Sequence, residues 1–187
     1  MATNIEQIVK NLTAFYNFAD RTVVAIGAGG GQLIEYARQT LRVIAVDKDG
    51  AAIEKLARRA DECGLAARLT LLQGDLLTLR PHGDVVLFEF CLHELPAPDQ
   101  ALGHAKQLAR DVLVIDHAPG SPWSWCAAEE AGVEAGWAAV ARMSVRRRRR
   151  VEAFQRFKDY AELEAKMTHQ GPTSLERIAP TGLKPPS

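Results

Sequence analysis

The sequence predicts a doubly wound α/β domain built on a mostly parallel sheet. Between about residues 20 and 120, short runs of Val, Ile and Leu alternate with helix-length segments. These runs are apolar throughout, which is typical of strands covered by helices on both faces. A glycine-rich loop follows the first run. Ligands of such sheets bind beyond the carboxyl ends of the strands, so we expect the functional residues just after each run.

The elements are expected in the following order. The first 20 residues contain an amphipathic helix, whose apolar stripe ends at Tyr16. Helices are expected after the glycine loop, around residues 53–60 and over residues 98–110. The predicted strands are residues 22–26, 42–46, 68–72, 84–88 and 111–115.

The alternation fails beyond residue 120. Ser121 and Pro122 are typical of a helix start, and the apolar spacing predicts one long helix that continues to about Val140. A second helix is expected at about 157–167, and residues 174–179 are a candidate sixth strand. The proline-rich end, residues 180–187, cannot form a central strand. We therefore expect one domain over residues 1–187: an N-terminal helix or lid (1–20), a core (21–120) and a helical extension (121–187).

Composition excludes several classes of protein. The chain has 187 residues, of which 47% are hydrophobic and 25% are charged, as in ordinary globular proteins. The 23 basic and 23 acidic residues cancel, so a dedicated nucleic-acid binder is not favoured. No window reaches the ~18 apolar residues that suggest a membrane span, and the first residues do not resemble a signal peptide. Three scattered cysteines fit neither a disulfide framework nor a zinc knuckle, and we expect a cytoplasmic protein.

Three signals follow three successive predicted strands. Gly27, Gly29 and Gly31 form a G-x-G-x-G loop, but Gln32 stands where a dinucleotide fingerprint needs glycine, which disfavours a nicotinamide dehydrogenase. Asp47 ends the second strand and can accept both hydroxyls of a ribose. Asp75, followed by Leu76, can accept a hydrogen bond from an adenine amino group. Each acid alone is better explained as part of a surface loop or as a helix cap. The three signals together favour a nucleoside cofactor.

At this point the chain resembles the class I S-adenosylmethionine-dependent methyltransferases, over about residues 20–120. The similar segments are residues 23–31, 43–47, 72–76 and 84–95. The resemblance implies a Rossmann-like fold that binds S-adenosylmethionine and releases S-adenosylhomocysteine. It implies that the glycines hold the methionine part, Asp47 the ribose and Asp75 the adenine, while Glu89 and Phe90 border the methyl group. The full expected cofactor set is Gly27, Ala28, Gly29, Gly31, Asp47, Lys48, Asp75, Leu76, Glu89, Phe90 and Tyr16.

Two features depart from the family pattern. Ala25 stands two positions before the first glycine, where the family usually has an acidic residue. The family sheet also ends in a hairpin of two strands, for which this chain offers only residues 174–179. Either the last strand is absent, or the N-terminal helix or a second subunit covers the sheet edge, since an open edge promotes aggregation. A homodimer is one way to cover it.

The expected catalytic residues are His93, Glu89 and His117, because they follow the fourth and fifth strands. Histidine exchanges protons near neutral pH, but a base is needed only when the acceptor arrives protonated. A structural role for either histidine is an equal alternative. Tyr16 is expected to close the cofactor pocket. We predict no metal, since no two candidate ligands have helical spacing such as H-x-x-x-H.

The sequence therefore predicts a methyltransferase acting on a small molecule, with the acceptor atom left open. One alternative is a methyltransferase that engages RNA or protein through the run Arg146–Arg150. Such a run is by default a solvated loop, and its functional interpretation is an anion contact. A second alternative is a cofactor-binding subunit without catalytic activity.

Overall fold

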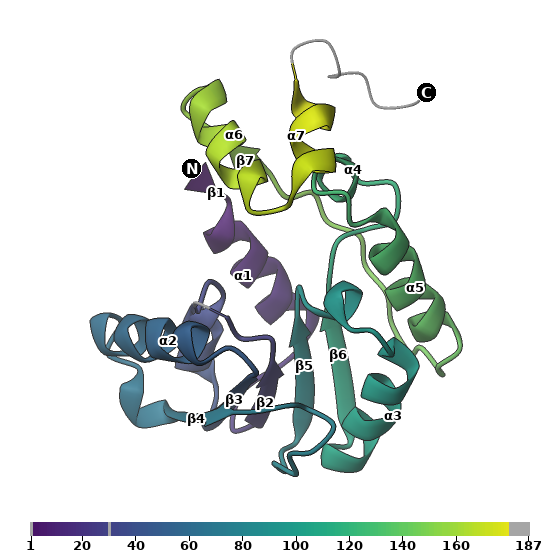
Figure 1. Cartoon of the computed structure of the whole chain (residues 1–187). Helices are drawn as coiled ribbons and strands as arrows, with labels where there is room; N and C mark the ends of the chain where they lie inside the picture. Colours follow the sequence, from purple (N-terminus) through teal and green to yellow (C-terminus); the bar gives the residue numbers. More distant parts are fainter. Residues whose placement is uncertain (1, 30, 180–187) are drawn as a thin grey trace.

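The computed structural model describes residues 2–29 and 31–179. Its centre is a five-stranded sheet in the order β4-β3-β2-β5-β6, in which every neighbouring pair is parallel (Figure 1). The strands are β2 (Thr22–Ile26), β3 (Arg42–Asp47), β4 (Leu69–Gln73), β5 (Val85–Glu89) and β6 (Asp111–Ile115). Strand order reverses between β2 and β5, so the point at which such sheets bind ligands lies beyond these two strands. The predicted fold class is confirmed.

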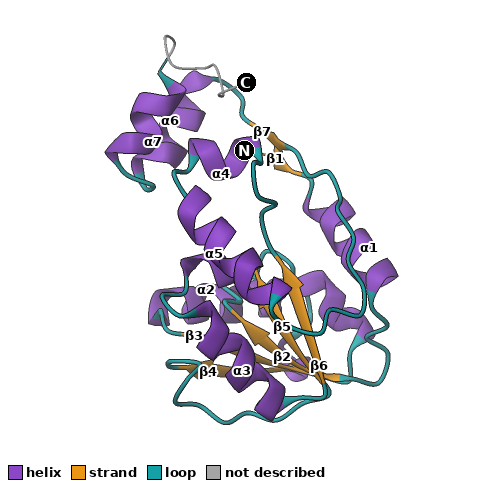
Figure 2. Cartoon of the chain, turned by 90° about the vertical axis from the view of Figure 1, so that its right-hand side faces the viewer, coloured by secondary structure: helices purple, strands orange, loops and turns teal. Residues whose placement is uncertain are grey.

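Helices cover both faces of the sheet, as the apolar strands predicted. On one face, α1 (Ile5–Phe15), the 3-10 helix η1 (Ile34–Gln39) and α2 (Gly50–Glu62) share one hydrophobic core with β2, β3 and β5. On the other face, α3 (Pro98–Leu108) and α5 (Glu130–Ala141) share a second core with the same strands (Figure 2). All five residues of β5 are buried, which gives the strand at the switch point a rigid frame.

Two predicted helices differ from the observed ones. The segment after the glycine loop, expected to be a helix, forms only the short η1. The structure also contains two 3-10 turns that were not predicted, η2 (Ala66–Arg68) and η3 (Leu92–Glu94). The single long helix expected from Pro122 is divided into α4 (Pro122–Cys126) and α5. The division occurs because Ala128 adopts a left-handed backbone conformation, with φ of +57°. Alanine carries no turn signature, so the sequence did not reveal this break.

The C-terminal strand prediction is wrong. Residues 174–179 lie mostly in α7 (Pro172–Ile178), which begins with proline and buries Ser174 and Ile178, four residues apart on one helical face. The helix expected nearby is confirmed as α6 (Tyr160–Thr168). A short β7 (Gln155–Arg156) pairs antiparallel with β1 (Ala2–Thr3), separately from the main sheet. The predicted non-strand end, residues 180–187, lies outside the described residues.

The main sheet therefore ends at β6, and a groove of about 830 Å³ runs along this strand. The C-terminal half of α1, the segment around Arg146–Arg149 and residues of α3 and α5 form its other walls. The arginines are exposed but attached to the protein: Arg146 pairs with Asp111, while the Arg147 guanidinium lies 4.1 Å from the centre of the Phe15 ring. The run is thus exposed, as a solvated loop would be, but Arg146 and Arg147 also contact other segments of the protein. Within residues 2–29 and 31–179, no helix is long and apolar enough to cross a bilayer.

Candidate functional site

The glycine loop turns sharply where β2 ends. Gly27 and Gly29 have φ of +66° and +48°, a region that residues with a side chain rarely adopt. A Cβ on Gly27 would lie 2.3 Å from the Cβ of Cys91, whose thiol donates to the Ile26 carbonyl at 3.2 Å. Gly27 is therefore needed for internal packing. Among the described residues, only the Gly27 carbonyl lies within 4 Å of the Cβ position of Gly29, so this face of the loop has room for a ligand.

Asp47 joins the end of β3 to this loop. One carboxylate oxygen accepts the Gly29 N–H at 3.0 Å, and the other accepts the Asp49 N–H at 3.0 Å. The loop and the acid predicted to hold one cofactor are thus in direct contact. The neighbouring Lys48 is exposed. This contact between two strand ends is the strongest geometric support for a shared ligand site.

Asp75 and Leu76 follow β4 at the same end of the sheet. The Asp75 carboxylate is exposed and accepts the Leu77 N–H at 2.7 Å, which closes a local turn. Leu76 is buried in the core that contains Val46 and Phe88. The turn explains part of the sequence pattern without a ligand, while the exposed carboxylate retains room to accept another donor.

Glu89 is buried beneath the glycine loop. It lines the same small cavity as Ala25, Ala28 and Gly31, and it accepts a hydrogen bond from the Tyr36 hydroxyl at 2.7 Å. Burial raises the pKa of Glu89 to about 8, despite the opposing effect of that hydrogen bond. Of the three expected catalytic residues, Glu89 therefore belongs to the glycine-loop side of the site.

His93 and His117 lie together on the other side, where β5 and β6 end. Asp116 holds both segments: its carboxylate lies 2.5 Å from His93 Nδ1, and it accepts the backbone N–H of His93 at 3.0 Å and of His117 at 2.8 Å. Burial opposes protonation of His93, but the hydrogen bond and charge of Asp116 outweigh it and raise the pKa of that histidine. Burial lowers the pKa of His117 to about 4.

Phe90 connects the two sides. Its φ of +51° is unusual for an aromatic residue and turns the chain sharply after β5. The Phe90 ring lies 5.0 Å from the His117 ring, which in turn lies 5.3 Å from the His93 ring. Strained backbone of this kind often occurs at functional sites. Phe90 thus lies between Glu89 and the two histidines, as a residue bordering the reacting group would.

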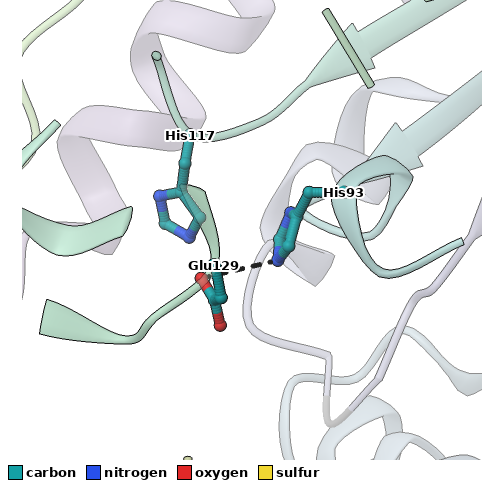
Figure 3. A group of neighbouring side chains, drawn as sticks. All are labelled: His93, His117 and Glu129. Carbon is teal, nitrogen blue, oxygen red and sulfur yellow. Dashed lines mark ion pairs between the residues drawn. The ribbon is translucent and has the colours of Figure 1, made fainter. Parts of the chain in front are cut away.

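Glu129 completes the histidine side and was not among the predicted residues. Its Oε2 lies 3.6 Å from His93 Nε2, and Figure 3 shows Glu129 facing both histidines. Gly132 allows α5 to approach His93 this closely, because a Cβ on Gly132 would lie 2.3 Å from the His93 carbonyl oxygen. A glycine at position 132, inside a helix, was the available sequence signal for close packing.

The expected role of Tyr16 does not agree with its position. Its hydroxyl donates to the Asp111 carboxylate at 2.9 Å, at the amino end of β6 and therefore opposite to the ligand-binding end of the sheet. Burial, followed by the hydrogen bond and charge of Asp111, raises the pKa of Tyr16 to about 12. The stripe that predicted the helix was correct, but Tyr16 fastens α1 to the sheet rather than closing a cofactor pocket.

Comparisons with known proteins agree with this architecture. Residues 24–111 match the family model described as a methyltransferase domain, and no curated protein sequence matches the chain. A SAM-dependent methyltransferase from Aquifex aeolicus is 20% identical, with a TM-score of 0.54 over 63% of this chain and 66% of that chain. Magnesium protoporphyrin IX methyltransferase (ChlM) from Synechocystis PCC 6803 with bound SAM is 23% identical, with a TM-score of 0.51 over 58% of this chain and 55% of that one.

The same fold occurs in the [4+2]-cyclase SpnF, which is 17% identical, with a TM-score of 0.57 over 72% of this chain and 57% of that chain. This chain spans between 55% and 66% of the length of these three structures. At such identities the structures establish a shared fold, while the family model matches the sequence itself from β2 to the start of β6. The sheet order, the glycine loop and the matched core sequence are consistent with a class I S-adenosylmethionine-dependent methyltransferase.

Proposed function

We propose that the chain binds S-adenosylmethionine and transfers its methyl group to a small-molecule acceptor, releasing S-adenosylhomocysteine. The observation that carries this proposal is the direct contact of Asp47 with the glycine loop at the switch point of the sheet. The ChlM structure, which shares the fold, has SAM bound. In this proposal the open face of Gly29 receives the methionine part, and Asp47 and Asp75 receive the ribose and the adenine.

Glu89 supplies, in this proposal, the carboxylate that Ala25 does not. Both residues line one cavity beneath the loop, and both are buried. A positively charged cofactor close to Glu89 would favour its ionised form. Glu89 is therefore assigned to holding the cofactor, and Phe90 to the boundary between the cofactor and the acceptor.

His93 and His117 form the acceptor side of the proposed site. Methyl transfer is an in-line displacement, so holding the acceptor against the methyl group supplies much of the rate. Asp116 fixes the His93 ring and directs Nε2 away from the sheet, toward Glu129 and His117. These groups can hold an acceptor and take up its proton.

Calorimetric titration with S-adenosylhomocysteine tests the cofactor. We expect saturable binding with one site, and Asp47→Ala should weaken it by about 1.5–3 kcal/mol through the loss of charge-assisted hydrogen bonds. The control is Asp61→Ala, which removes an exposed carboxylate from α2 and should leave the affinity unchanged. No binding at high ligand concentration, with the fold intact, contradicts the proposal.

A labelled-methyl assay separates the alternatives. The wild-type chain is incubated with labelled cofactor and with small-molecule, RNA and protein fractions of a cell extract. We expect label in the small-molecule fraction. Label in RNA or protein that disappears in a variant with Arg149 and Arg150 changed to Ser supports an acceptor engaged by the arginine run. Binding without turnover supports a non-catalytic subunit or another reaction on this fold, as the cyclase SpnF illustrates.

The proposed homodimer remains a prediction. Among the described residues, β6 is one of the two edge strands of the main sheet, with α1 and the arginine segment beside it but no further strand paired to it. Sedimentation equilibrium of the purified chain measures the oligomeric state. A monomer at all concentrations contradicts the prediction.

A further inference from the structure

We propose that His93, His117 and Glu129 form a binding site for a divalent transition-metal ion such as Zn²⁺. The three side chains each offer one ligand atom, and these atoms all lie within 4.8 Å of one another (Figure 3). They come from three segments: η3 after β5, the loop after β6, and the residue before α5. Ion binding itself is independent of the proposed function; only the role of the ion in the reaction rests on it.

One buried oxygen of the cluster without a hydrogen-bond partner supports a cation site. Glu129 Oε2 is buried and has no hydrogen-bond partner within the described part of the chain. It lies 3.6 Å from His93 Nε2, beyond hydrogen-bond distance. A buried carboxylate oxygen is costly to leave without a partner, and an ion that draws both atoms inward satisfies it.

Asp116 provides the outer support that metal-binding histidines usually have. Its carboxylate contacts His93 Nδ1 at 2.5 Å, which leaves Nε2 as the ligand atom. The same carboxylate accepts the backbone N–H groups of His93 and His117, so it fixes the spacing of the two histidine segments. A carboxylate that orients a ligating imidazole in this way fixes its tautomer and strengthens it as a ligand.

The donor set indicates which ions fit. Two imidazoles and one carboxylate suit Zn²⁺ and similar transition metals, whereas Mg²⁺ and Ca²⁺ prefer oxygen ligands. Three protein ligands leave at least one position for an acceptor hydroxyl or thiol, whose pKa the ion would lower. No two of these residues have helical ligand spacing, which is why the sequence predicted no metal. The fold instead gathers them from separate loops.

Titration of the purified, chelator-treated full chain with Co²⁺ tests the site through its visible absorption, without any activity assay. We expect one equivalent to bind. His117→Ala and the nearly isosteric Glu129→Gln should each abolish this binding, and Asp116→Asn should weaken it roughly 10–100-fold. The control is His82→Ala, which removes an exposed histidine outside the cluster and should bind Co²⁺ as the wild type does.

Two outcomes overturn the inference: no stoichiometric Co²⁺ binding by the folded wild type, or unchanged binding by Glu129→Gln with a native circular dichroism spectrum. The titration with S-adenosylhomocysteine is repeated on the chelator-treated protein. Nucleoside binding without Co²⁺ binding rejects the metal site and retains the proposed function. Co²⁺ binding without nucleoside binding retains the metal site and rejects the proposed function.

Discussion

The glycine loop and the helix α5 each pack a glycine tightly against the same short segment, residues 91–93. At Gly27, the space that a Cβ would take is filled by Cys91; at Gly132, it is filled by the carbonyl of His93. Residues 91–93 are therefore packed tightly between the glycine loop, on the proposed cofactor side, and α5, on the acceptor side. We call this arrangement the clamp. The difference is that Gly27 belongs to a recognisable motif, whereas Gly132 stands in an ordinary helix.

The two halves of the site are therefore not mechanically independent. Cys91 and His93 are two residues apart, so a shift that relieves a collision at one glycine moves the contact at the other. The buried acids differ in the same way. Glu89 accepts one hydrogen bond from Tyr36, whereas Asp116 accepts three from the two histidines. Asp116 therefore joins the two segments of the acceptor side, whereas on the loop side Asp47 joins the loop to β3 through the Gly29 N–H.

Gly27→Ala should have the largest effect on this clamp. The new Cβ collides with Cys91, and alanine must adopt φ of +66°. Left-handed strain of ~1–2 kcal/mol and overpacking of ~1–3 kcal/mol give an expected loss of about 2–5 kcal/mol in the free energy of unfolding, measured by urea titration. Gly29→Ala is the matched control. It introduces the same left-handed backbone strain without a collision of the new Cβ, so the free energy of unfolding should fall by only about 1–2 kcal/mol. Equal losses would contradict the clamp.

Glu89 should make stability fall as pH rises. Its pKa is raised by burial from 4.5 to about 8, so the folded protein holds a proton that the unfolded chain has released. The stabilisation is fully present below about pH 4.5 and is lost as pH rises to about 8, with a slope of about 1 kcal/mol per pH unit. Unfolding of wild type and Glu89→Gln is compared from pH 5 to 8. Parallel curves would show that Glu89 is ionised in the folded protein.

Gly132→Ala should disturb the acceptor side. Its Cβ would overlap the His93 carbonyl, and moving α5 away costs about 1–3 kcal/mol of unfolding free energy. The control is Gly103→Ala on the exposed side of α3, where no atom lies within 4 Å of the Cβ position. This control should gain about 0.5–1 kcal/mol from better helix propensity. A gain in both variants would mean that α5 does not press on His93.

Tyr16→Phe should have the smallest effect and tests the revised position of this residue. Loss of its hydrogen bond to Asp111 should lower the free energy of unfolding by about 1 kcal/mol. Affinity for S-adenosylhomocysteine, measured by calorimetry, should not change, because the contact lies at the amino end of β6. A marked loss of affinity at unchanged stability would restore the original role of Tyr16 as a lid.

The core was predictable because its signals are local. Apolar β-branched runs such as residues 22–26 and 42–47 form strands in any context that buries both faces, and glycine at position 27 is readable as a sharp turn. Residues 174–179 misled because their apolar positions fit a strand as well as one face of a short helix. Packing decided between them: Ser174 and Ile178 are buried together in α7.

Sequence alone determined the sheet, its two helical layers, and the order of the loop and acids along its edge, since each depends on the pattern of neighbouring residues. Tertiary structure alone decided which side chains meet: Glu89 with Tyr36, Tyr16 with Asp111, and Glu129 with the two histidines. The reason is physical. Strand and helix patterns repeat over a few residues, whereas these contacts join segments that only the closed packing of the whole chain brings together.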